Sequence, residues 1–526
     1  MTYTSFPYFV FLACLAVVYF VVPRKGQWIV LLAASYIFYY MAASVGAIVF
    51  LLVTTVSIFF IAKAIGGENQ KQLAALTSSA ESDEKIRIKR LYAARKKRIL
   101  IIGLLLNFGI LAVLKYSNFV VINVGSLFNT DIGLPHLLLP LGISFYTFQS
   151  AGYLIDVYRG RYEPDGNIFK FALFTSFFPQ IVQGPISRHD QLAHQLYAEH
   201  KFDWTQAKHG VELILWGLFK KLVIADRAVV FVNYALGNSE SIEGFQTAAG
   251  CLIFMAYVYA DFSGGIDISR GICQVLGIEM TENFRRPHFS FSVSEYWRRW
   301  HITLGAWMRD YIFYSITLSK TFGRMGKSLR GKLGSYWAAA IPACIGMGIT
   351  FMVVGIWHGA AWKFIAFGAY NGFFIMIETL FLGRLADWNE KHGLIKTKAF
   401  SWRLIRTLFT FFIIYISKFF AMSYGAGQAV QMIKSSFSVF NPQIFFDGTL
   451  YTMGLSEMSF KLLLLAIFIF FVVSLMQENG IRLREALDRQ NLVFRWFIYF
   501  AAVFSILIFG VYGPDIDPAA FVYQQF

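Results

Sequence analysis

The chain has 526 residues, of which 57% are hydrophobic and only 15% are charged, and this balance excludes an ordinary soluble globular protein. The formal net charge is +16, but the basic residues lie in short stretches between apolar segments. We therefore expect them to contact anionic membrane lipids, and we expect no nucleic-acid partner. The four cysteines are widely spaced in apolar surroundings, which predicts core residues and neither a disulfide framework nor a metal site: Cys14, Cys251, Cys273 and Cys344.

Apolar segments long enough to cross a hydrocarbon core of about 30 Å recur along the chain. The continuous ones are 6–22, 28–43, 47–64, 99–114, 337–357, 404–422, 462–476 and 497–511. With less regular segments between 136 and 280, they predict an all-α polytopic membrane protein with roughly 11 transmembrane helices. Because no repeat or linker divides residues 1–526, we expect a single integral membrane domain.

The polar segment 66–98 indicates how the chain is oriented in the membrane. It holds nine Lys and Arg residues against four Asp and Glu residues. The positive-inside rule predicts that this segment is a cytoplasmic loop, together with the loop that contains Arg24 and Lys25, and that the N-terminus is extracytoplasmic. The first apolar segment has neither the basic region nor the cleavage site of a secretory signal, so we expect a retained anchor.

The middle of the chain mixes apolar residues with Pro, Gly, Asp, Arg and His, notably in the segments 140–160, 168–187, 256–280 and 283–310. Irregular backbone and ionisable groups are tolerated at membrane depth only where they are buried in protein or line a water-filled cavity. We therefore expect these segments to surround a pocket or tunnel.

His301 lies in a segment with clear helix-start signals. Pro287 favours an extended lead-in, and Ser292 and Glu295 have the spacing of a capping box. If the helix continues, one face carries Trp297, Trp300, His301, Leu304 and Met308. The arginines then lie mostly away from that face, where they would contact phosphates or acidic headgroups: Arg298, Arg299 and Arg309. An interfacial helix anchored by Trp and Arg is the structural alternative.

His358 lies within the apolar run 350–362, and glycines at 346, 348, 355 and 359 allow close helix approach or a local break beside it. An ionisable side chain at membrane depth costs a few kcal/mol, so it persists where a cavity, a partner or a reaction uses it. Burial disfavours the charged imidazole, and a neutral imidazole is the form that a general base needs. The alternative is a histidine satisfied by an interhelical hydrogen bond.

Three acidic residues at membrane depth have simpler explanations. Asp267 and Arg270 have the spacing of a helical ion pair, as do Asp156 and Arg159. We expect these pairs, and Asp261 near them, to have structural roles rather than catalytic ones.

Two long motifs resemble the signature stretches of the membrane-bound O-acyltransferase (MBOAT) superfamily. They are Tyr296-Trp-Arg-Arg-Trp-His-Ile-Thr-Leu-Gly-Ala-Trp-Met-Arg-Asp-Tyr311 and Gly355-Ile-Trp-His-Gly-Ala-Ala-Trp362. Segments 140–160, 178–185, 259–265 and 520–526 are similar to the branch that contains the alginate O-acetyltransferase membrane subunit. The membrane protein of teichoic-acid D-alanylation is a related branch. The chain departs from the pattern at Gln524, where an aromatic residue is usual, and in the length of its basic loop.

The resemblance implies an MBOAT-type helical fold around a central tunnel, with residues 136–382 as the catalytic core. It implies that His358 is the catalytic histidine and that His301 is the second polar residue of the site. An acyl thioester would enter from the cytoplasm and the acceptor from the other side. Trp297, Trp300 and Trp357 would shape the walls, and Arg298, Arg299 and Arg309 would bind phosphates of the donor.

The expected function is therefore transfer of an acetyl group across the bacterial cytoplasmic membrane, for O-acetylation of an exopolysaccharide or cell-wall glycan. The donor would be acetyl-CoA as a substrate, with no bound cofactor and no metal, and an extracytoplasmic acetyltransferase or acceptor protein would be the partner. The first alternative is D-alanyl transfer to teichoic acid from a carrier-protein thioester. A proton-coupled transporter also uses buried His, Asp and Arg in broken helices, but this chain has no evident inverted repeat.

Overall fold

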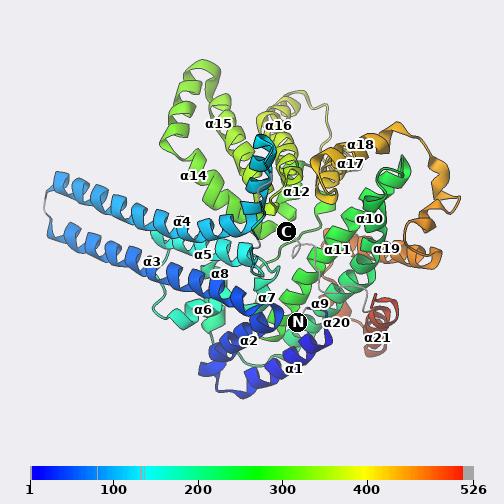
Figure 1. Cartoon of the computed structure of the whole chain (residues 1–526), viewed down its shortest axis with the longest axis horizontal. Coiled ribbons are helices and arrows are strands. Elements are labelled where there is room, and N and C mark those ends of the chain that lie inside the picture. Colours follow the sequence, from blue (N-terminus) through cyan, green and yellow to red (C-terminus); the bar gives the residue numbers. More distant parts are fainter. Residues whose placement is uncertain (1–2, 80, 131–132, 136, 513–526) are drawn as a thin grey trace. The chain divides into compact units, whose positions relative to one another are not determined.

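The computed structural model describes residues 3–79, 81–130, 133–135 and 137–512. These residues form helices without any β-strand, apart from one isolated bridge between Phe284 and Trp300 (Figure 1). The expected all-α architecture is confirmed. Segment 520–526, which resembles the alginate O-acetyltransferase branch and includes Gln524, lies outside the described residues.

Eight described helices are long and apolar enough to cross a membrane: α3 (Val45–Ser78), α4 (Ser82–Phe128), α11 (Phe245–Val275), α15 (Lys320–His358), α16 (Trp362–His392), α17 (Phe400–Met422), α19 (Glu457–Glu478) and α21 (Leu492–Phe509). A shorter apolar helix, α1 (Phe6–Val21), precedes them. The chain is thus a multi-pass membrane protein, with fewer long spans among the described residues than the roughly 11 expected, because residues 6–21, 27–42 and 143–197 form helices of 16 residues or fewer.

The structure divides into two compact units, and residues 1–211 with 269–281 form the first. Besides α1, α3 and α4, this unit contains α2 (Gln27–Ala42), α5 (Ile143–Tyr158), α6 (Ile168–Ser176), α7 (Phe178–Ile181) and α8 (His189–Tyr197). Buried tyrosines join its segments, since the Tyr3 hydroxyl donates to the Phe178 carbonyl at 2.9 Å and the Tyr39 hydroxyl to the Leu141 carbonyl at 2.9 Å. Asp156 forms an ion pair with Arg161 at 3.2 Å.

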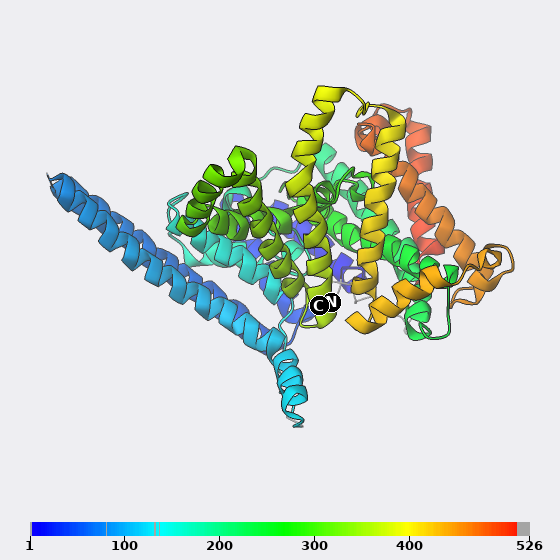
Figure 2. The same cartoon turned by 90° about the horizontal axis from the view of Figure 1, so that it is seen from above.

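Most of the basic segment 66–98, expected as a loop between spans, is helical: residues 66–78 belong to α3 and residues 82–98 to α4. It forms the ends of α3 and α4, which run side by side as a long hairpin (Figure 2). Residues 68–98 contain no Gly or Pro and are rich in Ala, Leu, Lys, Arg, Glu and Gln, which favour helix. Lys96 Nζ joins the two helices by donating to Asn69 Oδ1 at 2.7 Å and to Gln72 Oε1 at 2.9 Å.

Residues 212–268 and 282–526 form the second unit, which contains both histidines singled out above. Besides α15, α16, α17, α19 and α21, its helices are the π-helix η2 (Phe219–Ala225), α10 (Asp226–Gly237), η3 (Pro287–Phe289), α12 (Val293–Arg299), α13 (Ile302–Trp307), the π-helix η4 (Met308–Phe313), α14 (Tyr314–Thr317), α18 (Ala426–Ser438), η5 (Pro442–Phe445), η6 (Thr449–Thr452) and α20 (Leu483–Asp488). Helices α9 (Trp204–Leu218) and α11 each contribute residues to both units.

Helices α15 and α16 pack against each other along much of their length and meet at two glycines. A Cβ added to Gly355 would lie 2.4 Å from the Phe364 carbonyl oxygen, and one added to Gly368 would lie 2.5 Å from the Phe351 carbonyl oxygen. The close helix approach predicted from the glycines is therefore confirmed.

The cysteine prediction holds in part. Cys251, Cys273 and Cys344 are buried, whereas Cys14 is exposed on α1. All four are free thiols. The exposure of Cys14 corrects its assignment to the core, because α1 is apolar around its whole circumference and its sequence does not reveal which face packs inside the protein.

Candidate active site

The helix that leads to His301 begins as predicted. The Ser292 hydroxyl accepts from the Glu295 amide at 3.0 Å, and Glu295 Oε2 accepts from the Phe291 amide at 2.8 Å. A second cap was not predicted: Glu378 of α16 accepts from the amides of Val293 at 2.6 Å and Ser294 at 2.8 Å. Free amides at a helix start attract carboxylates, but a partner 85 residues away has no local sequence signal.

The predicted continuation of this helix through His301 is wrong. Helix α12 ends at Arg299, Trp300 is extended, and His301 has a positive φ of 47° before α13 begins. The break follows from pairing with the upstream segment, because the Arg285 amide donates to the Arg299 carbonyl at 2.9 Å and Phe284 bridges Trp300. A non-glycine residue at positive φ stores about 1–3 kcal/mol, which the surrounding packing must offset.

Asn283 determines how His301 is held. Its Oδ1 accepts from the Thr303 amide at 3.0 Å, from the Thr303 hydroxyl at 2.9 Å and from His301 Nδ1 at 3.3 Å. Because an amide oxygen only accepts, Nδ1 of His301 carries the hydrogen and Nε2 presents a lone pair. His301 lies outside the eight apolar helices and is 1% exposed, and burial lowers its pKa to about 3, so the ring is neutral at physiological pH.

His358 is the last residue of α15 and is buried. The helix ends there at Gly359, where an added Cβ would lie 2.3 Å from the Phe364 ring. The His358 ring stacks on Phe364 with 6.3 Å between centroids and meets the edge of Phe367 at 5.6 Å. The glycines therefore allow both the helix crossing and the break beside the histidine.

Trp357 brings the two histidines into one site. Its indole lies 5.7 Å from the His301 ring and 5.1 Å from the His358 ring, measured between ring centroids. Phe262 packs edge-on against His301 from α11 at 4.9 Å. Two imidazoles 57 positions apart in the chain thus share one buried aromatic environment.

The other two tryptophans have different surroundings. Trp297 donates through Nε1 to Asn371 Oδ1 at 3.2 Å and lies 5.9 Å from the Phe367 ring, which in turn contacts His358. Trp300 is buried against the Phe284 ring at 5.0 Å, and Lys418 Nζ lies 4.4 Å above its indole. Trp297 therefore lies next to the histidine site, whereas Trp300 anchors the backbone break before His301.

The three candidate arginines also differ from one another. Arg299 is engaged by carboxylates, contacting Glu295 at 2.7 Å and Glu478 at 2.8 Å, and Glu478 also pairs with Arg286 at 2.8 Å. Arg298 and Arg309 are exposed, and Arg309 contacts Asp310 at 3.3 Å. Arg299 thus braces α12 against α19, a role for which the sequence has no local signal.

Buried ion pairs hold α11, as we expected from a structural role of Asp261 and Asp267. Lysines take part in these pairs. Lys221 Nζ lies 2.7 Å from Asp261 Oδ1, and Lys220 Nζ lies 2.7 Å from Asp267 Oδ2. Both lysines belong to the π-helix η2, a helical form that is frequent at functional sites. The pairs fix the part of α11 that carries Phe262, which packs on His301.

The sequence is similar to proteins of known families. Residues 164–331 match the family model of MBOAT, the membrane-bound O-acyltransferase family. The chain is 33% identical over 348 residues to the probable alginate O-acetylase AlgI of Pseudomonas syringae pv. tomato, covering 65% of this chain and 61% of that protein.

More distant relatives include the peptidoglycan O-acetyltransferase of Helicobacter pylori, 29% identical with 54% of this chain and 56% of that protein covered. The teichoic acid D-alanyltransferase of Bacillus subtilis is 27% identical, with 49% and 62% covered. The chain thus spans less than two thirds of each relative's length. Together with the eight apolar helices, the matches show a multi-pass membrane protein whose residues 164–331 are similar to the membrane-bound O-acyltransferase family and which is similar to bacterial alginate O-acetylases.

Proposed function

We propose that this protein is a membrane O-acetyltransferase that passes an acetyl group from acetyl-CoA toward a hydroxyl of an exopolysaccharide or cell-wall glycan. The observation that carries the proposal is the contact of His301 and His358 with one indole, within the two motifs that resemble the family signatures. The names of the alginate and peptidoglycan relatives support acetyl transfer to a glycan.

The chemistry requires a base for the attacking hydroxyl. His358 takes the hydroxyl proton while the oxygen attacks the thioester carbon, so that a C–O bond forms and the C–S bond breaks. The proton then passes to the departing thiolate and yields the free thiol of CoA. His301 orients the acceptor: its Nδ1 hydrogen is directed to Asn283, and its Nε2 lone pair accepts a hydrogen bond from a second hydroxyl of the glycan, because the single hydrogen of the attacking hydroxyl goes to His358.

The donor side and the partners follow from topology. The basic hairpin of α3 and α4 and the positive-inside rule support a cytoplasmic donor and an extracytoplasmic N-terminus in the bacterial cytoplasmic membrane. A glycan acceptor outside the membrane then requires acetyl to cross it, with an extracytoplasmic acetyltransferase or acceptor protein as partner. Trp297 and Trp357 shape the route beside the histidines.

A second candidate is D-alanyl transfer from a carrier-protein thioester, which the similarity to teichoic acid D-alanyltransferases supports at lower identity. Purified protein offered both thioesters in competition distinguishes the two functions. The proposed donor predicts acetyl consumption and no D-alanyl consumption.

The base assignment is tested by His358→Ala in purified full-length protein. We expect the rate of acetyl-CoA consumption to fall by about 10²–10⁴-fold, the usual contribution of a general base. His392→Ala is the matched control, because His392 is an exposed histidine near the end of α16. Size-exclusion chromatography verifies that both variants are folded, and a parental rate in folded His358→Ala would contradict the assignment.

A further inference from the structure

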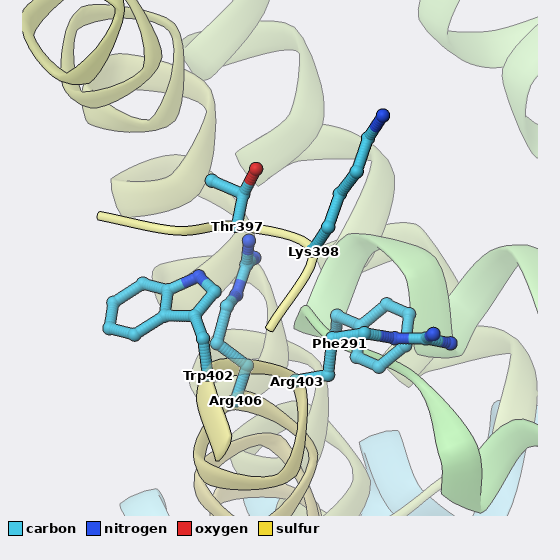
Figure 3. Close-up of a pocket in the computed structure, with 6 residues that line it drawn as sticks. All are labelled: Phe291, Thr397, Lys398, Trp402, Arg403 and Arg406. Carbon is cyan, nitrogen blue, oxygen red and sulfur yellow. The ribbon is translucent and has the colours of Figure 1, made fainter. Parts of the chain in front are cut away.

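A basic pocket of about 380 Å³ opens in the second unit, where the chain turns from α16 into α17 (Figure 3). Its lining residues are Phe291, Thr397, Lys398, Trp402, Arg403 and Arg406. Neither histidine lines it, so it is separate from the candidate active site. Three of its six lining side chains are cationic, two are aromatic and none is acidic.

This lining suits a ligand that carries both phosphate and a flat ring. Guanidinium groups bind phosphate through paired hydrogen bonds, and aromatic faces stack on nucleobases. The Arg403 guanidinium already lies 5.0 Å above the Phe291 ring. Figure 3 shows the Arg406 guanidinium extending toward Thr397, with the Trp402 indole on one side and Lys398 beyond. A lipid headgroup shares the phosphate but has no flat ring for Trp402.

The pocket lies on the segment that leads to the histidines. Phe291 directly precedes the capped start of α12, which carries Trp297. On the other wall, Arg406 lies 12 residues before Lys418 in α17, and Lys418 contacts the Trp300 ring beside His301. At 1.5 Å per residue, the pocket is about 18 Å along α17 from that contact.

This separation matches the length of the pantetheine arm of CoA. The pantetheine chain of CoA has about 13 bonds between its phosphate and its sulfur, which extend on the order of 15 Å at ordinary covalent geometry. Residues 384–406 around the pocket also contain six Lys and Arg residues against two acidic ones, which the positive-inside rule assigns to the cytoplasm. The pocket is thus on the side where CoA is available.

We propose that this pocket binds the phosphorylated adenosine end of the CoA thioester, with Lys398 and Arg406 on the phosphates and Trp402 against the adenine. The inference rests on the proposed function, since it assumes a CoA donor. A carrier-protein thioester has the same pantetheine arm and no adenosine, so the pocket would be the feature that selects the free coenzyme.

The test compares two donors in full-length protein: acetyl-CoA, and S-acetylpantetheine, which has no nucleotide. In the double variant Lys398→Gln with Arg406→Gln, we expect the ratio of kcat/KM for acetyl-CoA to that for S-acetylpantetheine to fall about 10-fold or more. Binding of adenosine 3′,5′-bisphosphate, measured by calorimetry, should weaken to the same extent. Arg324→Gln with Lys327→Gln is the control, because both residues are exposed on α15 and neither lines the pocket.

An unchanged donor ratio with unchanged bisphosphate affinity would overturn the proposal. So would a loss of binding of short-chain phosphatidylglycerol to the detergent-solubilised double variant with bisphosphate affinity intact, because that result would assign the pocket to lipid. Failure of the proposed function has a different signature. In that case the parental protein transfers acetyl from neither donor, while bisphosphate still binds and still depends on Lys398 and Arg406.

Discussion

At the scale of single residues, the site depends on one amide oxygen. Asn283 Oδ1 accepts three hydrogen bonds, of which one fixes the tautomer of His301 and two fix the first turn of α13. The positive φ of His301 turns the backbone at the same point. Orientation of the imidazole and the course of the chain are therefore maintained by the same side chain.

Asn283→Asp tests that control through pH dependence. The carboxylate keeps the acceptor oxygens but adds a negative charge beside His301, which favours the imidazolium and raises the pKa of His301 from about 3. The Nε2 lone pair is then lost at a higher pH, so as pH falls kcat/KM should decline at a higher pH in the variant than in the parental enzyme. The measurement is kcat/KM against pH for both proteins.

Asn283→Ala provides the comparison for this variant. It removes the acceptor for the Thr303 amide and for His301, and an unsatisfied buried donor costs about 1–3 kcal/mol, so unfolding should occur at lower temperature. Identical pH profiles for the Asp variant and the parent would show that Asn283 does not set the state of His301.

At the scale of elements, the end of α15 is positioned by its crossing with α16. Gly355 lies three residues before His358, and Gly359 follows the histidine directly, so a crossing point and a break flank it. Helix α16 also contributes Phe367 against His358, Asn371 to Trp297 and the Glu378 cap of α12. One helix therefore places both histidine segments.

Gly355→Ala should disturb both packing and chemistry. Its Cβ would lie 2.4 Å from the Phe364 carbonyl oxygen, so the helices must separate, at a cost of about 1–3 kcal/mol for overpacking. We expect a lower unfolding temperature in detergent and a reduced kcat, because His358 moves with the end of α15. Gly331→Ala, which lies before the break of α15 at Gly334, is the matched control, since nothing lies within 4 Å of its added Cβ. Equal effects of the two substitutions would contradict a specific role for the crossing.

At the scale of the whole molecule, the sequence predicts where the apolar segments lie but not where every helix begins and ends. The sequence predicts the apolar segments 47–64 and 99–114 but not the helical form of their polar continuations, because charge indicates a loop whereas Ala, Leu, Lys and Glu favour helix. The break at His301 was also missed, since it depends on pairing with residues 283–285, far from any local propensity. The glycine pattern around His358 worked because close helix approach leaves a direct residue signature.

The transfer direction depends on which side of the membrane each loop occupies, and single cysteines can determine this in a Cys14→Ser background. Lys89→Cys lies on the exposed, basic part of α4, which we expect in the cytoplasm. Asp447→Cys lies between α17 and α19, and should be extracytoplasmic because α17 starts within the basic segment 384–406 and crosses once. In intact spheroplasts, a membrane-impermeant maleimide should label only Asp447→Cys, and Lys89→Cys should react only after permeabilisation. Labelling of Lys89→Cys in intact spheroplasts would place the hairpin outside and exclude the cytoplasmic donor side inferred from it.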